Sequence, residues 1–321
     1  MIAMKVIKTK LNYSSSYNLL ELSSLTVGDI IPFDIYIKKN ENYVIIIEAG
    51  TLLSDTLHKK LEKWESLYTS VKDEDKKTLS CETLKYYIQY NKDDVENRLK
   101  ILYSVNDKLF DAYLSNKNDR IDISCVESVV EAIIFLMKYD IKLLNKSMPF
   151  FINNDKVPTH SLHVAIYSIN LGNILRFKDK ELLQLGISAL LHDLGLKKID
   201  EAILNKDDQL TPEETSLMQK HSKYSVDIIK QNNIHDPYII DAVMHHHEHY
   251  DGTGYPEQLP RAEISEFASI LSICDVFDAL TNNRPYRKNF SSFAALKMMT
   301  KEASMLNKFN QRYINLFLKS L

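Results

Sequence analysis

The segment HHHEHYDGTGYP (residues 245–256) is the most informative stretch of this sequence. It joins three adjacent histidines to a turn whose two glycines and one proline prevent a helix from continuing. Upstream, Asp236-Pro237 combines a helix N-cap with a proline at the first helical position. The sequence therefore predicts a helix that delivers His245 to His247 to the edge of a non-helical turn.

Further helix signals surround this segment. Thr211-Pro212-Glu213-Glu214 has the pattern of a capping box, which predicts a helix running through His221. An apolar run from Leu182 to Leu191 ends at the pair His192-Asp193, which a glycine follows closely. Nine of the ten histidines lie at or after His160, and several of them fall on separate predicted helices. We therefore predict a helical domain over residues 151–321.

The pair His192-Asp193 offers two kinds of metal ligand side by side. A carboxylate can bridge two cations while histidines fill the outer positions, and such a nitrogen and oxygen shell suits iron, manganese or zinc. An isolated histidine is more often structural than a ligand. A structural role is therefore expected for His58, His163, His235 and His249.

The order of these residues resembles the HD-GYP family, a branch of the HD phosphohydrolases whose members hydrolyse cyclic di-GMP to linear pGpG or to GMP. The resemblance covers about residues 160–321 and extends to Asp275 and Asp278 in CDVFDALT. It implies a binuclear centre in which Asp193 is the bridging ligand. The implied metal ligands are His160, His192, Asp193, His221, His246, His247 and Asp275. His245 is expected to lie outside this set.

Two departures from the family pattern bear on the chemistry. Some members bind a third metal through a glutamate one helical turn before the first histidine, but this position is Lys156 here, so two divalent cations, iron or manganese, are expected. The family usually has His-Asp-x-Gly-Lys, and Leu196 replaces that lysine. Lys197 or Lys198 can supply a cation from a neighbouring position, because a lysine is a flexible point charge. We expect Asp193 and Lys197 to be the catalytic residues.

The resemblance also implies substrate contacts. The glycine turn lets the backbone approach a nucleotide closely, and Tyr255 offers a ring and a hydroxyl. Arginines after the Asp275 helix supply forked donors that suit a phosphate. The expected substrate-binding residues are Gly254, Tyr255, Pro256, Arg284 and Arg287.

Three functions follow from these residues. The first is a phosphodiesterase that hydrolyses cyclic di-GMP with a metal-activated water, and the complete ligand set favours it. The second is a catalytically weak sensor that binds cyclic di-GMP, and Leu196 favours it. The third is an HD hydrolase of another nucleotide, against which the GYP turn argues.

The N-terminal part has a different pattern. Alternating apolar residues such as Phe33, Ile35 and Ile37 predict a small α/β module over residues 1–78, with Ser54 capping a short helix. Apolar residues at helical spacing predict amphipathic connecting helices over residues 79–150, which pack on the catalytic domain or mediate a homodimer. The module has no catalytic cluster, so we expect it to receive a signal or dock a signalling protein.

Composition narrows the functional class. The net charge of −3 and the sequence pI near 6.4 argue against binding of polymeric nucleic acid. The N-terminus lacks a long apolar core, and charged residues interrupt the most apolar stretch, Val126 to Leu144. We therefore expect a cytoplasmic protein without a membrane span. The predicted fold is mainly α: a helical HD-type phosphohydrolase domain preceded by a small α/β module and connecting helices.

Overall fold

The chain divides into two compact units, Met1–Val105 and Asn106–Leu321. The computed structural model describes residues 17–25, 27–28, 30–31, 33–40, 42–48, 51–70, 81, 84, 88, 95–147, 157–206, 208–282, 289–302, 305 and 307–320. The boundary between the units falls inside the segment expected to form connecting helices.

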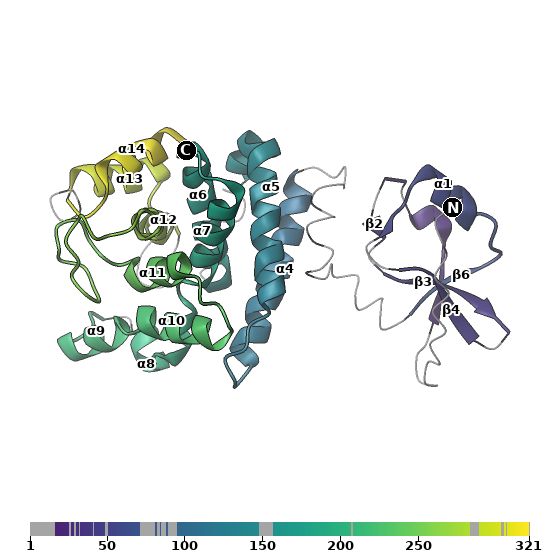
Figure 1. The fold of residues 1–321 in the computed structure, drawn as a ribbon, viewed down its shortest axis with the longest axis horizontal. Coiled ribbons are helices and arrows are strands. Elements are labelled where there is room, and N and C mark those ends of the chain that lie inside the picture. Colours follow the sequence, from purple (N-terminus) through teal and green to yellow (C-terminus); the bar gives the residue numbers. More distant parts are fainter. Residues whose placement is uncertain are drawn as a thin grey trace. The chain divides into compact units, whose positions relative to one another are not determined.

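The described part of the first unit contains two small antiparallel sheets, one short α-helix and the first half of a long helix that continues into the second unit (Figure 1). Its elements are β1 (Tyr17–Leu20), η1 (Leu22–Ser24), β2 (Ile30–Ile31), β3 (Ile35–Lys39), β4 (Asn42–Ile47), β5 (Thr51–Leu52), α1 (Asp55–Leu61) and β6 (Leu67–Ser70). The four-stranded sheet has the antiparallel order β1-β6-β3-β4, and β2 pairs with β5. The alternating residues Phe33, Ile35 and Ile37 are all buried in its core. Ser54 Oγ accepts a hydrogen bond from Leu57 N at 3.2 Å, which confirms the predicted N-cap.

The second unit is helical (Figure 1). It contains the second half of α4 (Val95–Ser115), α5 (Ile123–Ser147), α6 (Val157–Ile174), α7 (Asp179–Leu191), η4 (Leu194–Lys198), α8 (Glu201–Leu204), α9 (Pro212–Met218), α10 (His221–Gln231), α11 (Pro237–His245), α12 (Glu266–Thr281), α13 (Ser292–Lys301) and α14 (Gln311–Ser320). Helix α6 packs against α5, α7, α12 and α14. Helix α6 is buried on nearly all sides and therefore lies in the interior of the unit.

The predicted helix starts are confirmed, but one predicted helix is in fact two. Thr211 forms the capping box of α9, and Asp236 Oδ1 accepts hydrogen bonds from the first turn of α11. The helix predicted to run from Thr211 through His221 instead ends at Met218, and α10 begins at His221. The backbone tightens there through a hydrogen bond from Lys220 N to Leu217 O.

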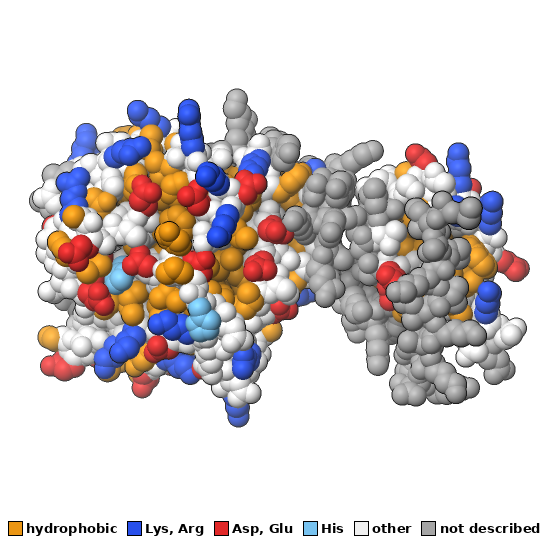
Figure 2. Space-filling model, in the orientation of Figure 1, with side chains coloured by type: hydrophobic (Ala, Val, Ile, Leu, Met, Phe, Trp, Pro, Cys, Tyr) orange, Lys and Arg blue, Asp and Glu red, His pale blue; other side chains and the backbone are white. Residues whose placement is uncertain are grey.

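The described helices include none that is long and apolar enough to cross a bilayer. Acidic and basic side chains are interspersed over the face of the second unit visible in Figure 2. This mixture is unlike the contiguous basic surface by which proteins hold polymeric nucleic acid.

Candidate metal centre

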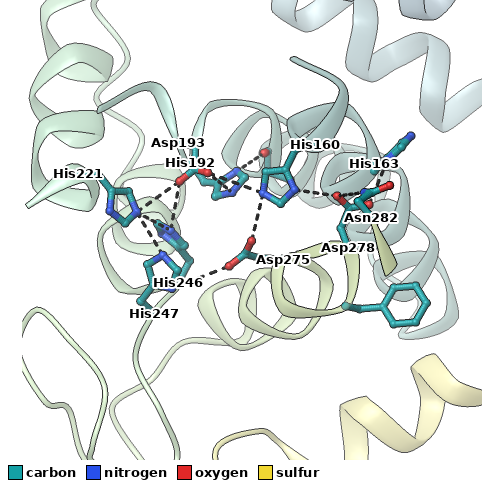
Figure 3. Close-up of polar contacts among 12 residues, drawn as sticks. His160, His163, His192, Asp193, His221, His246, His247, Asp275, Asp278 and Asn282 are labelled. Carbon is teal, nitrogen blue, oxygen red and sulfur yellow. Dashed lines mark hydrogen bonds and ion pairs between the residues drawn. The ribbon is translucent and has the colours of Figure 1, made fainter. Parts of the chain in front are cut away.

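The seven predicted metal ligands lie together in the second unit (Figure 3). They come from six helices, counting the short 3-10 helix η4, or from the residues that end or precede them. His160 lies on α6, His192 ends α7, Asp193 precedes η4, His221 begins α10, His246 ends α11 with His247 after it, and Asp275 lies on α12. His160 and Asp275 therefore lie in the same cluster although they are 115 positions apart in the sequence.

These seven side chains form two groups. The first contains Asp193, His221, His246 and His247, and the second contains His160, His192 and Asp275. Within each group the nitrogen and oxygen atoms that can bind a metal all lie within 4.8 Å of one another. Each group thus presents at least three convergent nitrogen or oxygen donors, a set that suits a divalent transition metal.

Asp193 lies between the two groups. Its Oδ1 is 3.3 Å from His221 Nε2 and 3.9 Å from His246 Nε2. Its Oδ2 is 3.4 Å from His192 Nε2 and 3.7 Å from His160 Nε2. One carboxylate oxygen therefore faces each group, which is the arrangement that a bridging ligand requires.

The backbone orients three of the imidazoles in the same way. The Nδ1 atoms of His192, His221 and His246 lie 2.7, 2.8 and 2.7 Å from the carbonyl oxygens three residues earlier. A carbonyl oxygen only accepts, so each Nδ1 carries the proton and each Nε2 presents a lone pair to the centre. His192 Nε2 is buried and has no hydrogen-bond partner in the described structure. A buried imidazole nitrogen without a hydrogen-bond donor fits the role of a metal ligand.

Asp278 holds the remaining buried imidazole of the second group. Its Oδ2 accepts a hydrogen bond from His160 Nδ1 at 2.7 Å, and Oδ1 lies 3.0 Å from His163 Nδ1. Asn282 Nδ2 donates to the same carboxylate at 2.6 Å. Burial would lower the pKa of His160, but Asp275 and Asp278 raise it to about 10. Sequence reasoning gave Asp278 no role, although its spacing of three from Asp275 on one helix face was the available signal.

The electrostatics of the first group favour the neutral form of His246 and His247 and the ionised form of Asp193. Burial lowers the pKa of His247 to about 4 and that of His246 well below its ordinary value. Burial would raise the pKa of Asp193, but the imidazoles of His192 and His221 outweigh it and hold this pKa well below its usual range. Neutral imidazole and ionised carboxylate are the forms that bind metal.

The glycine turn packs directly on this centre. The Tyr255 ring stacks on His247 with the centroids 4.7 Å apart, and Tyr255 N donates to His247 O at 3.1 Å. A Cβ atom on Gly254 would lie 2.3 Å from His249 N and 2.5 Å from Glu248 Cα, so only glycine fits here. The turn thus places Tyr255 beside the expected metal ligands, where the sequence predicted a substrate contact.

Glu248 fixes the far end of this turn. Its buried carboxylate accepts backbone hydrogen bonds from Glu257 N at 2.7 Å and from Leu259 N at 3.0 Å. Sequence reasoning did not assign this residue a role. Its position between the histidine pair and the glycine turn was the feature of the sequence that could have indicated this contact. His245 belongs to neither ligand group, and its Nδ1 lies 2.8 Å from Asp241 Oδ1.

The two lysines after Leu196 are bound elsewhere. Lys197 Nζ donates to the carbonyl oxygens of Tyr113 at 2.8 Å and of Asn116, and lies 3.2 Å from Asp119 Oδ1. Lys198 Nζ donates to Asp119 Oδ2. The Lys197 ammonium is therefore held at the C-terminal end of α4 and is not joined to either ligand group by the contacts described, so its catalytic role stays a prediction.

Gly195 allows η4 to lie against the helix that carries His221. A Cβ at this position would be 2.0 Å from His221 O and 2.6 Å from Ser225 N. Gly195 N also donates to Ser225 Oγ at 2.8 Å. This contact fixes Asp193, two residues earlier, relative to His221. Arg284, Arg287 and Lys156 lie outside the described residues.

Comparison with known proteins identifies the family of this chain. Residues 138–308, more than half of the chain, match the family model described as HD domain. The chain belongs to the HD domain family. The solved structure of Bd1817, an HDG"Y"P protein from Bdellovibrio bacteriovorus, superposes with a TM-score of 0.62 at 20% sequence identity, over 95% of this chain and 99% of that chain. The predicted mainly α fold is therefore confirmed.

Several curated relatives of this HD domain chain have phosphodiesterase names. It is 33% identical over 162 residues to the cyclic di-GMP phosphodiesterase PA4108 of Pseudomonas aeruginosa and 30% identical over 162 residues to the cyclic di-GMP phosphodiesterase PdeB of Borreliella burgdorferi, in each case over 50% of this chain. It is 37% identical over 142 residues, 44% of this chain, to 3'3'-cGAMP-specific phosphodiesterase 3 of Vibrio cholerae. The matches span 38%, 42% and 30% of these relatives' own lengths. The resemblance to the HD-GYP family is confirmed.

Proposed function

We propose that this chain is a metal-dependent phosphodiesterase that hydrolyses cyclic di-GMP to pGpG, to GMP, or to both. The observation that carries the proposal is the position of Asp193, whose two oxygens face two separate groups of histidine and carboxylate ligands. Relatives named for hydrolysis of cyclic di-GMP support the same substrate class.

We infer that two divalent cations, iron or manganese, occupy these groups. When bound, such cations lower the pKa of a water molecule and neutralise the oxygens of the phosphodiester. The donor set fits them, because neutral imidazole with carboxylate is a shell that both metals accept. His221, His246 and His247 would hold one cation, His160, His192 and Asp275 the other, and Asp193 both.

The reaction consumes one water for each phosphodiester. The water oxygen bonds to phosphorus, the bond from phosphorus to the 3′ oxygen breaks, and the leaving 3′ oxygen takes up a proton. One such step opens cyclic di-GMP to pGpG, and a second step gives two GMP. Tyr255, beside His247, and the backbone of Gly254 and Pro256 would line the nucleotide, while Arg284 and Arg287 would contact its phosphates.

The alternative is a cyclic di-GMP sensor with weak catalysis. The observation that favours it is that Leu196 replaces a lysine and the Lys197 ammonium is bound to Tyr113 O and Asp119. Substitution of Lys197 by methionine tests its proposed catalytic role. A fall in kcat with unchanged metal content supports that role, and an unchanged kcat removes it.

The first test is cyclic di-GMP turnover by anaerobically purified protein reconstituted with iron or manganese, with metal content measured on the same samples. Asp193→Ala is expected to lose metal and activity together. The matched control is Asp227→Asn, which alters an exposed aspartate on α10. Full metal content in Asp193→Ala rejects the bridging role. Binding without turnover in fully metallated wild type supports the sensor instead.

We also infer that the first unit serves as an input or docking module for a signalling protein, and that α4 and α5 mediate a homodimer. Both helices are amphipathic, which a dimer contact requires, but α5 also packs on α6 and α7 within the chain, which is the other role expected of these helices. Light scattering of the full chain gives the oligomeric state, and a monomer at all concentrations rejects the dimer.

A further inference from the structure

A cavity of about 360 Å³ adjoins the candidate metal centre. Asp193 belongs both to the cavity wall and to the first ligand group. The other walls are mainly apolar and come from α4, η4 and α8: Phe110, Tyr113, Leu114, Leu196 and Leu204. The volume lies within the range of sites that hold small organic ligands. A group that fills this cavity therefore lies directly beside the proposed reaction centre.

The walls are unsuited to a phosphate. Leu196, where the family resemblance led us to expect a phosphate-binding lysine, presents an apolar side chain to the cavity. Lys197 also lines it, but its ammonium donates to Tyr113 O and faces Asp119. A cation that is already paired and hydrogen-bonded attracts a further anion weakly. The occupant expected from these walls is flat and apolar rather than anionic.

Glu201, the exposed first residue of α8, also lines this cavity and, among the described residues, is the one with a side-chain carboxylate there besides Asp193. A carboxylate only accepts hydrogen bonds, so it selects a ring edge that carries donors. The pairing edge of guanine offers two adjacent donors, the ring N1–H and the exocyclic amino group. Adenine presents an unprotonated N1 on that edge, which a carboxylate repels. The combination of apolar walls and one carboxylate thus matches guanine.

We propose that this cavity binds one guanine base of the dinucleotide and that Glu201 selects guanine over adenine. This inference rests on the proposed function, because it assigns a specificity pocket to that same site. It also gives Leu196 a role, since a leucine packs against a base where a lysine would hold a phosphate. Apolar contact with the faces of a base and hydrogen bonds to its edge are how enzymes bind an unpaired base.

The test measures binding by calorimetry with manganese-loaded full-length protein, using cyclic di-GMP and cyclic di-AMP. Wild type is expected to prefer cyclic di-GMP at least 10-fold. Glu201→Gln, whose amide offers one acceptor and one donor, is expected to shrink this preference by about 10-fold. The matched control is Glu213→Gln, an exposed glutamate in the first turn of α9, which should leave the preference unchanged. An unchanged preference in Glu201→Gln overturns the assignment of Glu201.

Occupancy of the cavity is tested separately with Leu196→Trp and Leu204→Trp, which fill it from two different walls. Both are expected to weaken cyclic di-GMP binding at least 10-fold while manganese content and the thermal unfolding curve stay as in wild type. Wild-type affinity in both variants overturns the pocket. Wild-type protein that binds the nucleotide without hydrolysing it contradicts the proposed phosphodiesterase activity. The binding ratios above then still test whether the cavity holds the base. A wild type that binds neither nucleotide overturns both.

Discussion

Replacement of Glu248 by glutamine tests whether the glycine turn is held by a buried carboxylate. Glu248 is 1% exposed, and its two oxygens accept hydrogen bonds from Glu257 N and Leu259 N. Glutamine has the same length but only one oxygen, so its amino group must face one of the two N–H donors. One backbone donor then loses its partner in a buried place.

The cost follows from the strength of that bond. A hydrogen bond to a charged group contributes about 1.5–3 kcal/mol, and a buried donor left unpaired costs a similar amount. In a domain of this size, 1 kcal/mol shifts the melting temperature by about 2–4 °C. We therefore expect the Glu248→Gln variant to melt about 3–12 °C below wild type. The turn should also loosen beside His247, so kcat/KM for cyclic di-GMP should fall by more than the fraction of unfolded protein explains.

Thermal unfolding followed by circular dichroism measures the stability, and initial rates at 20 °C measure the activity. The matched control is Glu263→Gln, which changes an exposed glutamate shortly before α12. A Glu248→Gln variant that melts within 1 °C of wild type and retains full activity would refute the reasoning, because it would show that the two backbone donors find other partners without cost.

Two further predictions concern carboxylates outside the ligand set. Asp278→Asn keeps the shape but weakens the hydrogen bond that orients His160, so we expect metal affinity to fall about 10–100-fold in a competitive chelator titration; wild-type affinity would remove the orienting role. Burial would raise the pKa of Asp119, but hydrogen bonds from Lys198 and Lys197 lower it below its ordinary value. Its contribution to the free energy of unfolding is therefore complete above about pH 4 and lost as the pH falls through the lowered pKa. Unfolding titrations from pH 6 to pH 3 should show this loss in wild type and not in Asp119→Asn, and equal slopes would contradict it.

The sequence predicts the helix ends that carry several of the expected ligands, because those ends have local signals. His246 and His247 follow a capped helix, and a glycine turn stops that helix at the required place. His192 follows an apolar run that is buried along its length in α7. Such signals act over a few residues, so periodicity and capping rules detect them.

Long-range contacts were not predictable in the same way. His160 and Asp278 are 118 positions apart, and only the packing of α12 on α6 brings them within 2.7 Å. Likewise, no local rule assigns Lys197 to a backbone carbonyl of Tyr113, 84 positions earlier. The break between Met218 and His221 also escaped prediction, because the helix propensity of this segment is continuous and the break depends on the packing of α10 on η4.

Because Leu196 stands where the family has a lysine, the proposed enzyme lacks one cation beside the substrate phosphate. A lysine moved by one position would keep a cation at the phosphate, but Lys197 is committed to the end of α4 and to Asp119. Under the proposed function, the phosphate charge must then be neutralised by the bound cations and by Arg284 and Arg287. Substrate affinity should therefore depend more strongly on metal occupancy here than in an enzyme that keeps the lysine. Under the guanine-pocket proposal, Leu196 contacts the base at the position where the family has a phosphate-binding lysine.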